Sequence, residues 1–412
     1  MVLLSFVAAG GLCCAWLRTL GLSRKAALAG GLVFALAPYR VGQSTGHLLG
    51  LVSFLLPAAL LALERRRFAM AALALVAIPL SGQVHLALGA VVLCLGYVFA
   101  RVARPDRWKA AAAALVTAAA GLAVQLVVIR GSIAGGGRSF AQVERYSAEL
   151  SDVVTRGVGA GIEELVFVGW LTPLLALAGL WVARERRGLA WLLGLAAALP
   201  LVLALGANVP FYESLWQALP PLRFTRVPER LVPISCLAIA ALVACAVDKL
   251  VTHCHKRRLP AALATVFLLA LLALDVRVPV FGAVAPDRAS AAYAAMREPG
   301  RLLELPVFRP DLHYGSVYLA YARQSPRERP QGYSTTAPPA ADRLARTLRG
   351  LSCGRGSVPA ELGVRYVAVH RAQYAQSRFF GPGCPEAAEA RLRELGWRLL
   401  ARDRLISSWR SP

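Results

Sequence analysis

Residues 210–231 read PFYESLWQALPPLRFTRVPERL and lead directly into the apolar run LVPISCLAIAALVACAV of residues 231–247. Four large apolar side chains recur at helical spacing in the first half of this stretch: Phe211, Leu215, Trp216 and Leu219. This spacing predicts a short helix that lies flat on a membrane surface. Pro220 and Pro221 end that helix, because proline has no backbone N–H and its ring crowds the preceding turn.

Three arginines follow the two prolines and stand at the mouth of the apolar run: Arg223, Arg226 and Arg230. Guanidinium groups in such a place can bind a phosphate through forked, charge-assisted hydrogen bonds. They can equally anchor the chain at the interface, with long side chains that carry the charge to water. The residues alone leave both interpretations open.

The composition places the chain in a membrane. Of 412 residues, 57% are hydrophobic, and the mean hydropathy is +0.54, too high for an ordinary soluble protein. The 46 basic residues outnumber the 23 acidic ones, a net charge of +23. Long apolar runs argue against nucleic acid as the partner, whereas arginines at membrane boundaries follow the positive-inside rule. The basic excess beyond residue 275 would suit anionic lipid head groups.

Ten apolar segments predict ten membrane-spanning helices. The stretch 68–100 is too long for one crossing, and PLSGQVH in its centre divides it into two spans joined by a tight turn. The other eight segments are 2–17, 26–38, 48–63, 110–128, 165–182, 189–205, 231–247 and 260–274. We read the first as a retained helix, because it lacks a basic start and a small-residue cleavage site.

The loops between these segments alternate in charge. Every short basic loop falls on one side if the spans alternate, which is typical of cytoplasmic loops. The amino terminus, the long loops 130–164 and 206–230, and everything after residue 275 are then outside. The sequence predicts a transmembrane helical domain over 1–275 and an extracytoplasmic domain over 276–412.

The second domain is predicted to be a small α/β unit. We expect helices over 290–296, 340–349 and 386–396, strands over 301–307 and 364–370, and a closing hairpin over 397–410. A group of rings lies in its first half: His313, Tyr314, Tyr318, Tyr321 and Tyr333. Tyrosines on loops suit stacking against sugars, and they suit protein packing as well.

The eight cysteines show no metal or redox spacing. Five lie inside apolar runs, where cysteine behaves as a small hydrophobe: Cys13, Cys14, Cys94, Cys236 and Cys245. Cys254 stands between two histidines with no fourth ligand near, so no metal site is expected. Cys353 and Cys384 lie in glycine-bearing turns of the predicted outer domain. Because the space outside the membrane is oxidising, we expect them to form a disulfide. No Gly-rich phosphate loop occurs, and no cofactor is evident.

Several stretches, in order, resemble bacterial polytopic glycosyltransferases of the GT-C superfamily. Residues 33–64 read VFALAPYRVGQSTGHLLGLVSFLLPAALLALE, followed by LSGQVHLALGAVVLCLGYV at 80–98, YSAELSDVV at 146–154 and FTRVPERLV at 224–232. Three further pieces lie in the second domain: LLELPV at 302–307, QGYSTTAPP at 331–339 and LGVRYVAVHRAQY at 362–374. The resemblance covers about the whole chain.

The resemblance implies an enzyme of the bacterial inner membrane. It would transfer a sugar from a polyprenyl-phosphate donor to a glycan, lipid or protein acceptor of the cell envelope, at the outer face. Arg226 and Arg230 match the family's juxtamembrane arginines, so with Arg223 they are expected to bind the donor phosphate. The family's catalytic acid in the first outer loop has no counterpart, because no Asp or Glu precedes Glu64. The chain thus resembles an enzyme without its first span and first outer loop, and the alternative is a non-catalytic lipid-linked-sugar binding or scaffolding protein.

Other polar residues at predicted membrane boundaries are candidates for the site. Glu149 and Asp152, three residues apart in RYSAELSD, are the local carboxylate pair that could act as a general base, or they are simply solvated. Gln83 and His85 at the tight turn could contact the acceptor, or they could pair with helix ends. Arg40 and His47 complete this set of boundary residues.

Overall fold

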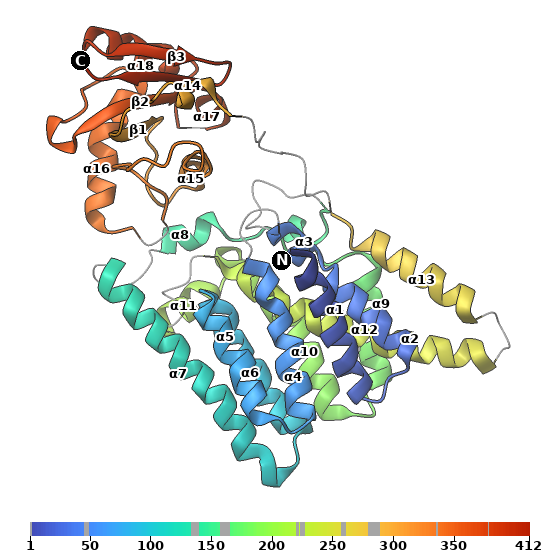
Figure 1. Cartoon of the computed structure of the whole chain (residues 1–412). Helices are drawn as coiled ribbons and strands as arrows, with labels where there is room; N and C mark the ends of the chain where they lie inside the picture. The colour runs from blue at the N-terminus through green and yellow to red at the C-terminus, as the bar shows by residue number, and fades with distance from the viewer. Residues whose placement is uncertain are drawn as a thin grey trace. The chain divides into compact units, whose positions relative to one another are not determined.

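The computed structural model describes residues 2–44, 49–132, 140–156, 165–219, 222, 227–256, 261–278, 289–334, 337–377 and 379–412. The chain divides into two compact units (Figure 1). The helical unit comprises Met1–Val127 and Gly137–Ala283, and the sheet unit comprises Val128–Gly136 and Val284–Pro412. Each is described by itself.

The helical unit contains a helix in each of the ten apolar segments. Its α-helices are α1 (Val2–Thr19), α2 (Arg24–Ala35), α3 (Pro38–Gln43), α4 (Leu55–Glu64), α5 (Phe68–Leu80), α6 (Val84–Arg101), α7 (Arg107–Ser132), α8 (Phe140–Arg145), α9 (Leu171–Ala183), α10 (Arg187–Ala204), α11 (Tyr212–Ala218), α12 (Val232–Lys256) and α13 (Ala261–Asp275). Short 3-10 helices are η1 (Leu49–Phe54), η2 (Arg104–Asp106), η3 (Leu150–Val153), η5 (Gly206–Asn208) and η7 (Pro228–Leu231). As expected, the stretch 68–100 is two helices, separated by a turn at 81–83.

Several helices are long and apolar enough to cross a bilayer, so this is a membrane protein. Within the described residues five stretches qualify: Val2–Thr19, Val84–Arg101, Arg104–Val124, Arg187–Ala204 and Pro228–His253. Four apolar helices are shorter: Gly50–Glu64, Phe68–Leu80, Leu171–Ala183 and Thr265–Asp275. The number of ten crossings therefore stays a prediction.

The segment predicted over 165–182 is partly wrong. Residues 165–169 are not helical, and α9 begins only at Leu171. The Asp275 carboxylate accepts hydrogen bonds from the backbone N–H groups of Trp170, Leu171 and Thr172, at 2.8, 3.0 and 2.9 Å. These contacts satisfy donors that a helix leaves open at its start, and they fix where α9 begins.

Helix α12 is the centre of the helical unit. Every residue from Val232 to Val247 is buried except Cys245, which is half-buried, and α12 packs against α2, α9 and α10. A helix that is apolar all round can be enclosed by other helices, and α12 is the most enclosed of the described candidate spans. Glycines allow the closest approach: a Cβ on Gly179 would lie 1.8 Å from the Leu242 carbonyl oxygen, and one on Gly30 would lie 2.8 Å from that of Ala240.

The short basic loops share one end of the helical unit. Arg186 donates to the carbonyl of Leu20 at 2.7 Å, and the Ser23 N–H donates to Asp248 at 2.8 Å. Glu64 pairs with Arg101 at 2.9 Å and also accepts from Tyr97, whose hydroxyl accepts from Trp16. These contacts tie the ends of α1, α4, α6 and α9 to one another and to the last part of α12, so the described basic loops share one end, as the charge alternation predicts.

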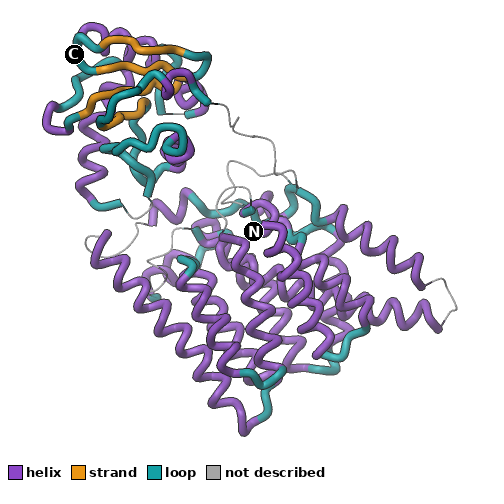
Figure 2. The backbone as a smooth tube through the Cα atoms, viewed as in Figure 1, coloured by secondary structure: helices purple, strands orange, loops and turns teal. Residues whose placement is uncertain are grey.

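The sheet unit contains a four-stranded sheet with the strand order β1-β2-β4-β3. Its strands are orange in Figure 2. Strands β1 (Arg301–Leu305) and β2 (Val364–His370) are parallel, and β4 (Ile406–Arg410) lies antiparallel to both β2 and β3 (Arg398–Arg402). The helices are α14 (Ala291–Ala294), α15 (Ser316–Tyr321), α16 (Pro339–Arg349), α17 (Arg371–Gln376) and α18 (Cys384–Glu394). Parallel pairing needs a crossover connection, and the chain between β1 and β2 contains α15 and α16.

Buried clusters lie on both faces of the sheet at β1, β2 and β4, because successive side chains of a strand point to opposite faces, whereas β3 is largely exposed. Leu303, Leu305, Val367 and Trp409 belong to a buried apolar cluster, whereas Leu302 packs in another cluster with Tyr293, Tyr366 and Ile406. A disulfide joins Cys353 to Cys384, the pair expected from the sequence. It ties the chain just before β2 to the start of α18.

Candidate functional site

Four of the stretches that carry the family resemblance meet at one end of the helical unit. We call this the motif cluster and define it by residues 38–44, 49–53, 83–85, 146–148 and 228–231. It lies at the start of α12, whereas the basic loops lie near Asp248 in the last part of that helix. The cluster is therefore at the opposite end from the basic loops.

Arg40 is one of two fully buried charged side chains in the described part of the cluster, the other being Glu229. Its guanidinium donates to the carbonyls of Gly50 and Ser5 at 3.0 and 3.1 Å, and it also bonds to the hydroxyl of Ser53. The Phe34 ring centroid lies 5.4 Å from the guanidinium carbon. Arg40 is not exposed at all, so its charge is paired inside the protein. It fastens α3 to α1 and η1, since a charge in an apolar interior must be paired.

Gln43, one turn after Arg40, connects two stretches that are 186 residues apart. Its amide Nε2 donates to Oε1 of Glu229 at 3.4 Å, and both side chains are buried. Glu229 lies in η7, which begins at Pro228 directly before α12. Gly50 packs closely against Gln43, because a Cβ on Gly50 would lie 2.7 Å from the Gln43 Cβ. A carboxylate is thus held inside the cluster.

Gln83 and His85 lie at the start of α6, which packs against η7. Gln83 is buried and His85 is half-buried. A Cβ on Gly89, one turn further along, would lie 2.8 Å from a Leu231 methyl group. The structure thus brings both predicted polar residues to the same end as Glu229, while His47 lies outside the described residues.

Residues 146–148, the part of the motif cluster that follows α8, contact the loop between α10 and α11. The Ser147 hydroxyl accepts from the N–H of Ala207 at 2.9 Å, and the Asn208 amide donates to the Ala148 carbonyl at 2.8 Å. Gly206 in this loop has a φ of +48° and lies close to Pro228. A Cβ at position 206 would lie 3.0 Å from the Pro228 ring. Residues 146–148 are therefore placed beside η7 by this loop.

Glu149 and Asp152 lie in a different setting. They form a capping box around η3, in which the Glu149 N–H donates to the Asp152 carboxylate at 2.7 Å. Glu149 is exposed and Asp152 is half-buried. The structure gives both carboxylates a local role at the start of a helix turn.

Arg230 is the described member of the predicted phosphate-binding set. It is half-buried at the end of η7, directly after Glu229. Arg223 and Arg226 lie outside the described residues. In the part of the chain that the structure describes, no group of His, Cys, Asp and Glu could hold a metal ion.

Glu229 is the site residue that sequence reasoning did not single out. It occurs in one of the resemblance stretches, between Pro228 and Arg230, which was the available signal. Its burial could not be read from the sequence, because a carboxylate at the start of an apolar helix is usually solvated. A buried carboxylate beside an arginine can accept a proton, or it can balance the positive charge.

Comparison with known proteins identifies the fold. No family model matches the chain, and no curated protein matches it in sequence. Two electron-microscopy structures of the arabinofuranosyltransferase AftD from Mycobacteria, one of them a mutant, match it with TM-scores of 0.60 and 0.55. Both are 17% identical, and the matches cover 99% of this chain but only 33% and 34% of the AftD chains. The predicted GT-C resemblance is confirmed as a likeness of fold, and the chain spans about one third of AftD's length.

Proposed function

We propose that this protein is a membrane glycosyltransferase that takes a sugar from a polyprenyl-phosphate donor and transfers it to a cell-envelope acceptor at the outer face of the bacterial inner membrane. The likeness to AftD over nearly the whole chain supports the class of protein. The contact between Gln43 and Glu229 supports the position of the site, because it joins two distant resemblance stretches at the mouth of α12.

The donor phosphate would bind at η7. Arg230 is directly before α12, and Arg223 and Arg226 precede it by a few residues. When the sugar leaves the donor, the remaining phosphate carries negative charge. Guanidinium groups that are already in place would stabilise this charge more in the transition state than in the bound donor.

Glu229 is the candidate general base in the described part of the motif cluster. The reaction needs a group that removes the acceptor hydroxyl proton as oxygen attacks the sugar carbon. Gln43 donates to Oε1 of the Glu229 carboxylate and so helps to orient it. Glu149 and Asp152 are less suited, because their carboxylates cap η3.

A second candidate function is a non-catalytic protein that binds or holds lipid-linked sugars. It is favoured by the local role of Glu149 and Asp152, the carboxylate pair expected as the base, which cap η3. In that case the arginines would still bind the phosphate, and Glu229 would serve only to balance their charge. Both functions include binding of the donor, so only a measurement of sugar transfer distinguishes the enzyme from the binding protein.

The test is transfer in proteoliposomes that contain the full chain and a radiolabelled polyprenyl-phosphate sugar, with a cell-envelope extract as acceptor. We expect transfer by the wild type, a loss of 100-fold or more in kcat for Glu229→Gln, and retained donor binding in that variant. Glu149→Gln is the matched control and should keep its activity. If the wild type binds the donor but transfers no sugar, the non-catalytic function is supported. If Glu229→Gln keeps full activity, Glu229 is excluded as the base.

A further inference from the structure

The Arg40 guanidinium is divided between two elements of the helical unit. Its Nη1 donates to the Gly50 carbonyl at 3.0 Å and to the Ser53 hydroxyl, both in η1. Its Nη2 donates to the carbonyl and to the hydroxyl of Ser5 in α1, each at 3.1 Å. We call these four residues, Ser5, Arg40, Gly50 and Ser53, the Arg40 clamp.

The clamp holds a positive charge with neutral acceptors. Arg40 is fully buried, and in the described ranges no carboxylate pairs with it. Enclosing an ionisable side chain in a membrane bundle costs free energy, and such residues mark functional sites. The clamp therefore calls for an explanation beyond the packing of α3.

The geometry of the clamp requires an arginine. The acceptors are themselves fixed, since the Ser5 hydroxyl donates to the Leu51 carbonyl at 2.8 Å and the Ser53 hydroxyl to the Gly50 carbonyl at 2.5 Å. A guanidinium is a rigid fork whose two terminal nitrogens can serve α1 and η1 at once, whereas a lysine ammonium is a single point. Arg40→Lys would therefore keep the charge and lose the bridge.

The clamp lies one turn from the contact that orients the proposed base. Arg40 and Gln43 are three residues apart on α3, so their side chains are neighbours on its surface. Gly50 touches both, because a Cβ on Gly50 would lie 2.7 Å from the Gln43 Cβ and 3.6 Å from the Arg40 Cα. Gln43 Nε2 reaches Glu229 Oε1 at 3.4 Å, which is long for a hydrogen bond, so a small displacement of α3 would break it.

We propose that Arg40 is a positioning residue, whose clamp on α3 holds Gln43 against Glu229. The inference rests on the proposed function only in that Glu229 is taken as the base. Arg40 contacts α1 and η1, and it acts on η7 through Gln43. A merely local role would stabilise α3 and leave η7 unchanged.

The test is amide hydrogen exchange of the full chain in nanodiscs, followed in the η7 segment. The Arg230 and Val232 N–H groups donate to the Val227 and Glu229 carbonyls there, so their exchange reports the opening of η7. We expect exchange to be roughly tenfold faster in Arg40→Lys and in Gln43→Leu. The double variant should exchange no faster than Gln43→Leu alone, because residues that act in series are not additive.

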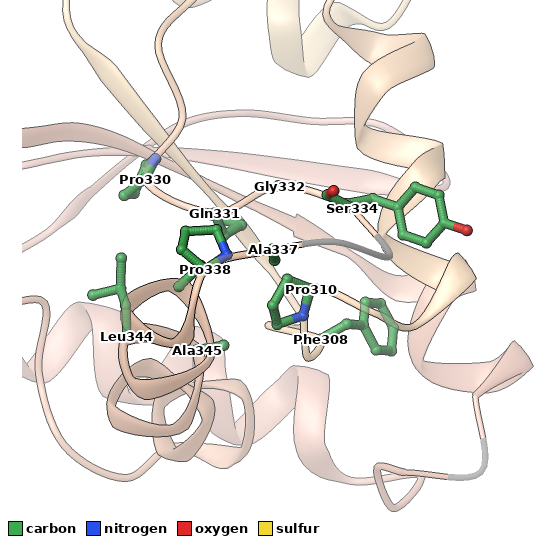
Figure 3. Close-up of a pocket in the computed structure, with 12 residues that line it drawn as sticks. Phe308, Pro310, Pro330, Gln331, Gly332, Ser334, Ala337, Pro338, Leu344 and Ala345 are labelled. Carbon is green, nitrogen blue, oxygen red and sulfur yellow. The ribbon is translucent and has the colours of Figure 1, made fainter. Parts of the chain in front are cut away.

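Ser53→Ala and two controls complete the set of variants. Ser53→Ala removes one acceptor of the clamp, and it should raise η7 exchange roughly threefold even if Arg40→Lys does not fold. Arg186→Lys is the matched control, since Arg186 donates to the Leu20 carbonyl at the basic end. Leu344→Ala removes packing in the sheet unit, where Leu344 lines a hollow beside Pro338 and Ala345 (Figure 3). Neither control should change η7 exchange.

The proposal is overturned if η7 exchange is unchanged in Ser53→Ala and in any folded Arg40→Lys. It is also overturned if the effects of Arg40→Lys and Gln43→Leu multiply in the double variant, or if either control opens η7 as much as Arg40→Lys does. In the transfer assay Arg40→Lys should lower kcat roughly tenfold and leave the donor KM unchanged. Full activity of Glu229→Gln, or a wild type without transfer, would reject the proposed function, and η7 exchange would still decide whether the clamp positions Gln43.

Discussion

His370 Nε2 lies 2.7 Å from Glu304 Oε2 in the interior of the sheet unit, although 66 residues separate them. The Tyr293 hydroxyl is 3.0 Å from the same His370 nitrogen and donates to Glu304. Burial, followed by the Glu304 charge, raises the pKa of Tyr293, so its hydroxyl stays protonated and remains a donor. Arg329 completes the set at 2.9 Å from Glu304 Oε1. The Glu304 carboxylate therefore joins β1 to β2 and to the segments before and after β1.

Replacing Glu304 should therefore unfold the sheet unit. In Glu304→Ala the buried Arg329 loses its partner, and breaking a buried pair costs roughly 3–5 kcal/mol. Pulse proteolysis across a urea series on the full chain measures the loss. Glu328→Ala is the control, since Glu328 pairs with Arg301 on the exposed surface. Equal resistance of the Glu304 and Glu328 variants would contradict a structural role for the buried carboxylate.

Gly169 should be intolerant of a side chain. Its φ is +101°, and an added Cβ would lie 2.3 Å from the Asp275 carboxylate that caps α9. Gly169→Ala should lower the melting temperature in nanodiscs more than Gly82→Ala. Gly82 also has a positive φ, of +85°, but open space around its Cα, so only backbone strain of about 1–2 kcal/mol is expected there. Equal shifts in the two variants would show that the clash with the cap is absent.

Arg230 should contribute to donor binding. Arg230→Ala removes a charge-assisted hydrogen bond to the phosphate, which is worth roughly 1.5–3 kcal/mol, a loss of about 10- to 150-fold in affinity. Arg226→Ala should behave similarly. Arg187→Ala, an exposed arginine at the basic end of the helical unit, should bind as the wild type does. The measurement is the affinity of each variant in nanodiscs for polyprenyl phosphate. Unchanged affinity in both test variants would indicate that Arg226 and Arg230 are membrane anchors only.

The two ends of the helical unit should face different compartments. Leu150→Cys, at a residue of η3 that is 75% exposed, should react in whole cells with an impermeant maleimide. Arg187→Cys, exposed at the basic end, should react only after the membrane is permeabilised. The expectation rests on the basic loops being cytoplasmic. Labelling of both positions in intact cells would refute the orientation.

Cys353 and Cys384 should be joined in protein purified from membranes. Closing a loop of 31 residues stabilises the fold by roughly 3–4 kcal/mol in the chain-entropy model. Mass spectrometry of non-reduced peptides should find the two joined and Cys13, Cys94 and Cys236, which are buried in the helical unit, as free thiols. Alkylation of both Cys353 and Cys384 without reduction would exclude the bridge and weaken the assignment of this region to the outside.

The elements of the sheet unit could be predicted closely because short-range patterns specify them. Strand β2 was expected over 364–370 and lies there, since alternating Val and Ala with a Gly363 before it is a local signal. The cysteine pair was likewise suggested by two glycine-bearing turns. The start of α9 was misplaced because its cap, Asp275, comes from a helix about 100 residues later, and no local pattern reveals it.

The sequence by itself determined the apolar helices, the alternation of basic loops and the ordered stretches that resemble GT-C glycosyltransferases. These are consequences of composition and spacing, which act within one helix or one loop. Only the tertiary structure decided that Glu229 is buried against Gln43, that Arg40 is enclosed, and that Glu149 and Asp152 cap a turn. Burial and pairing depend on partners far along the chain, and the free energy of a charge is set by those partners.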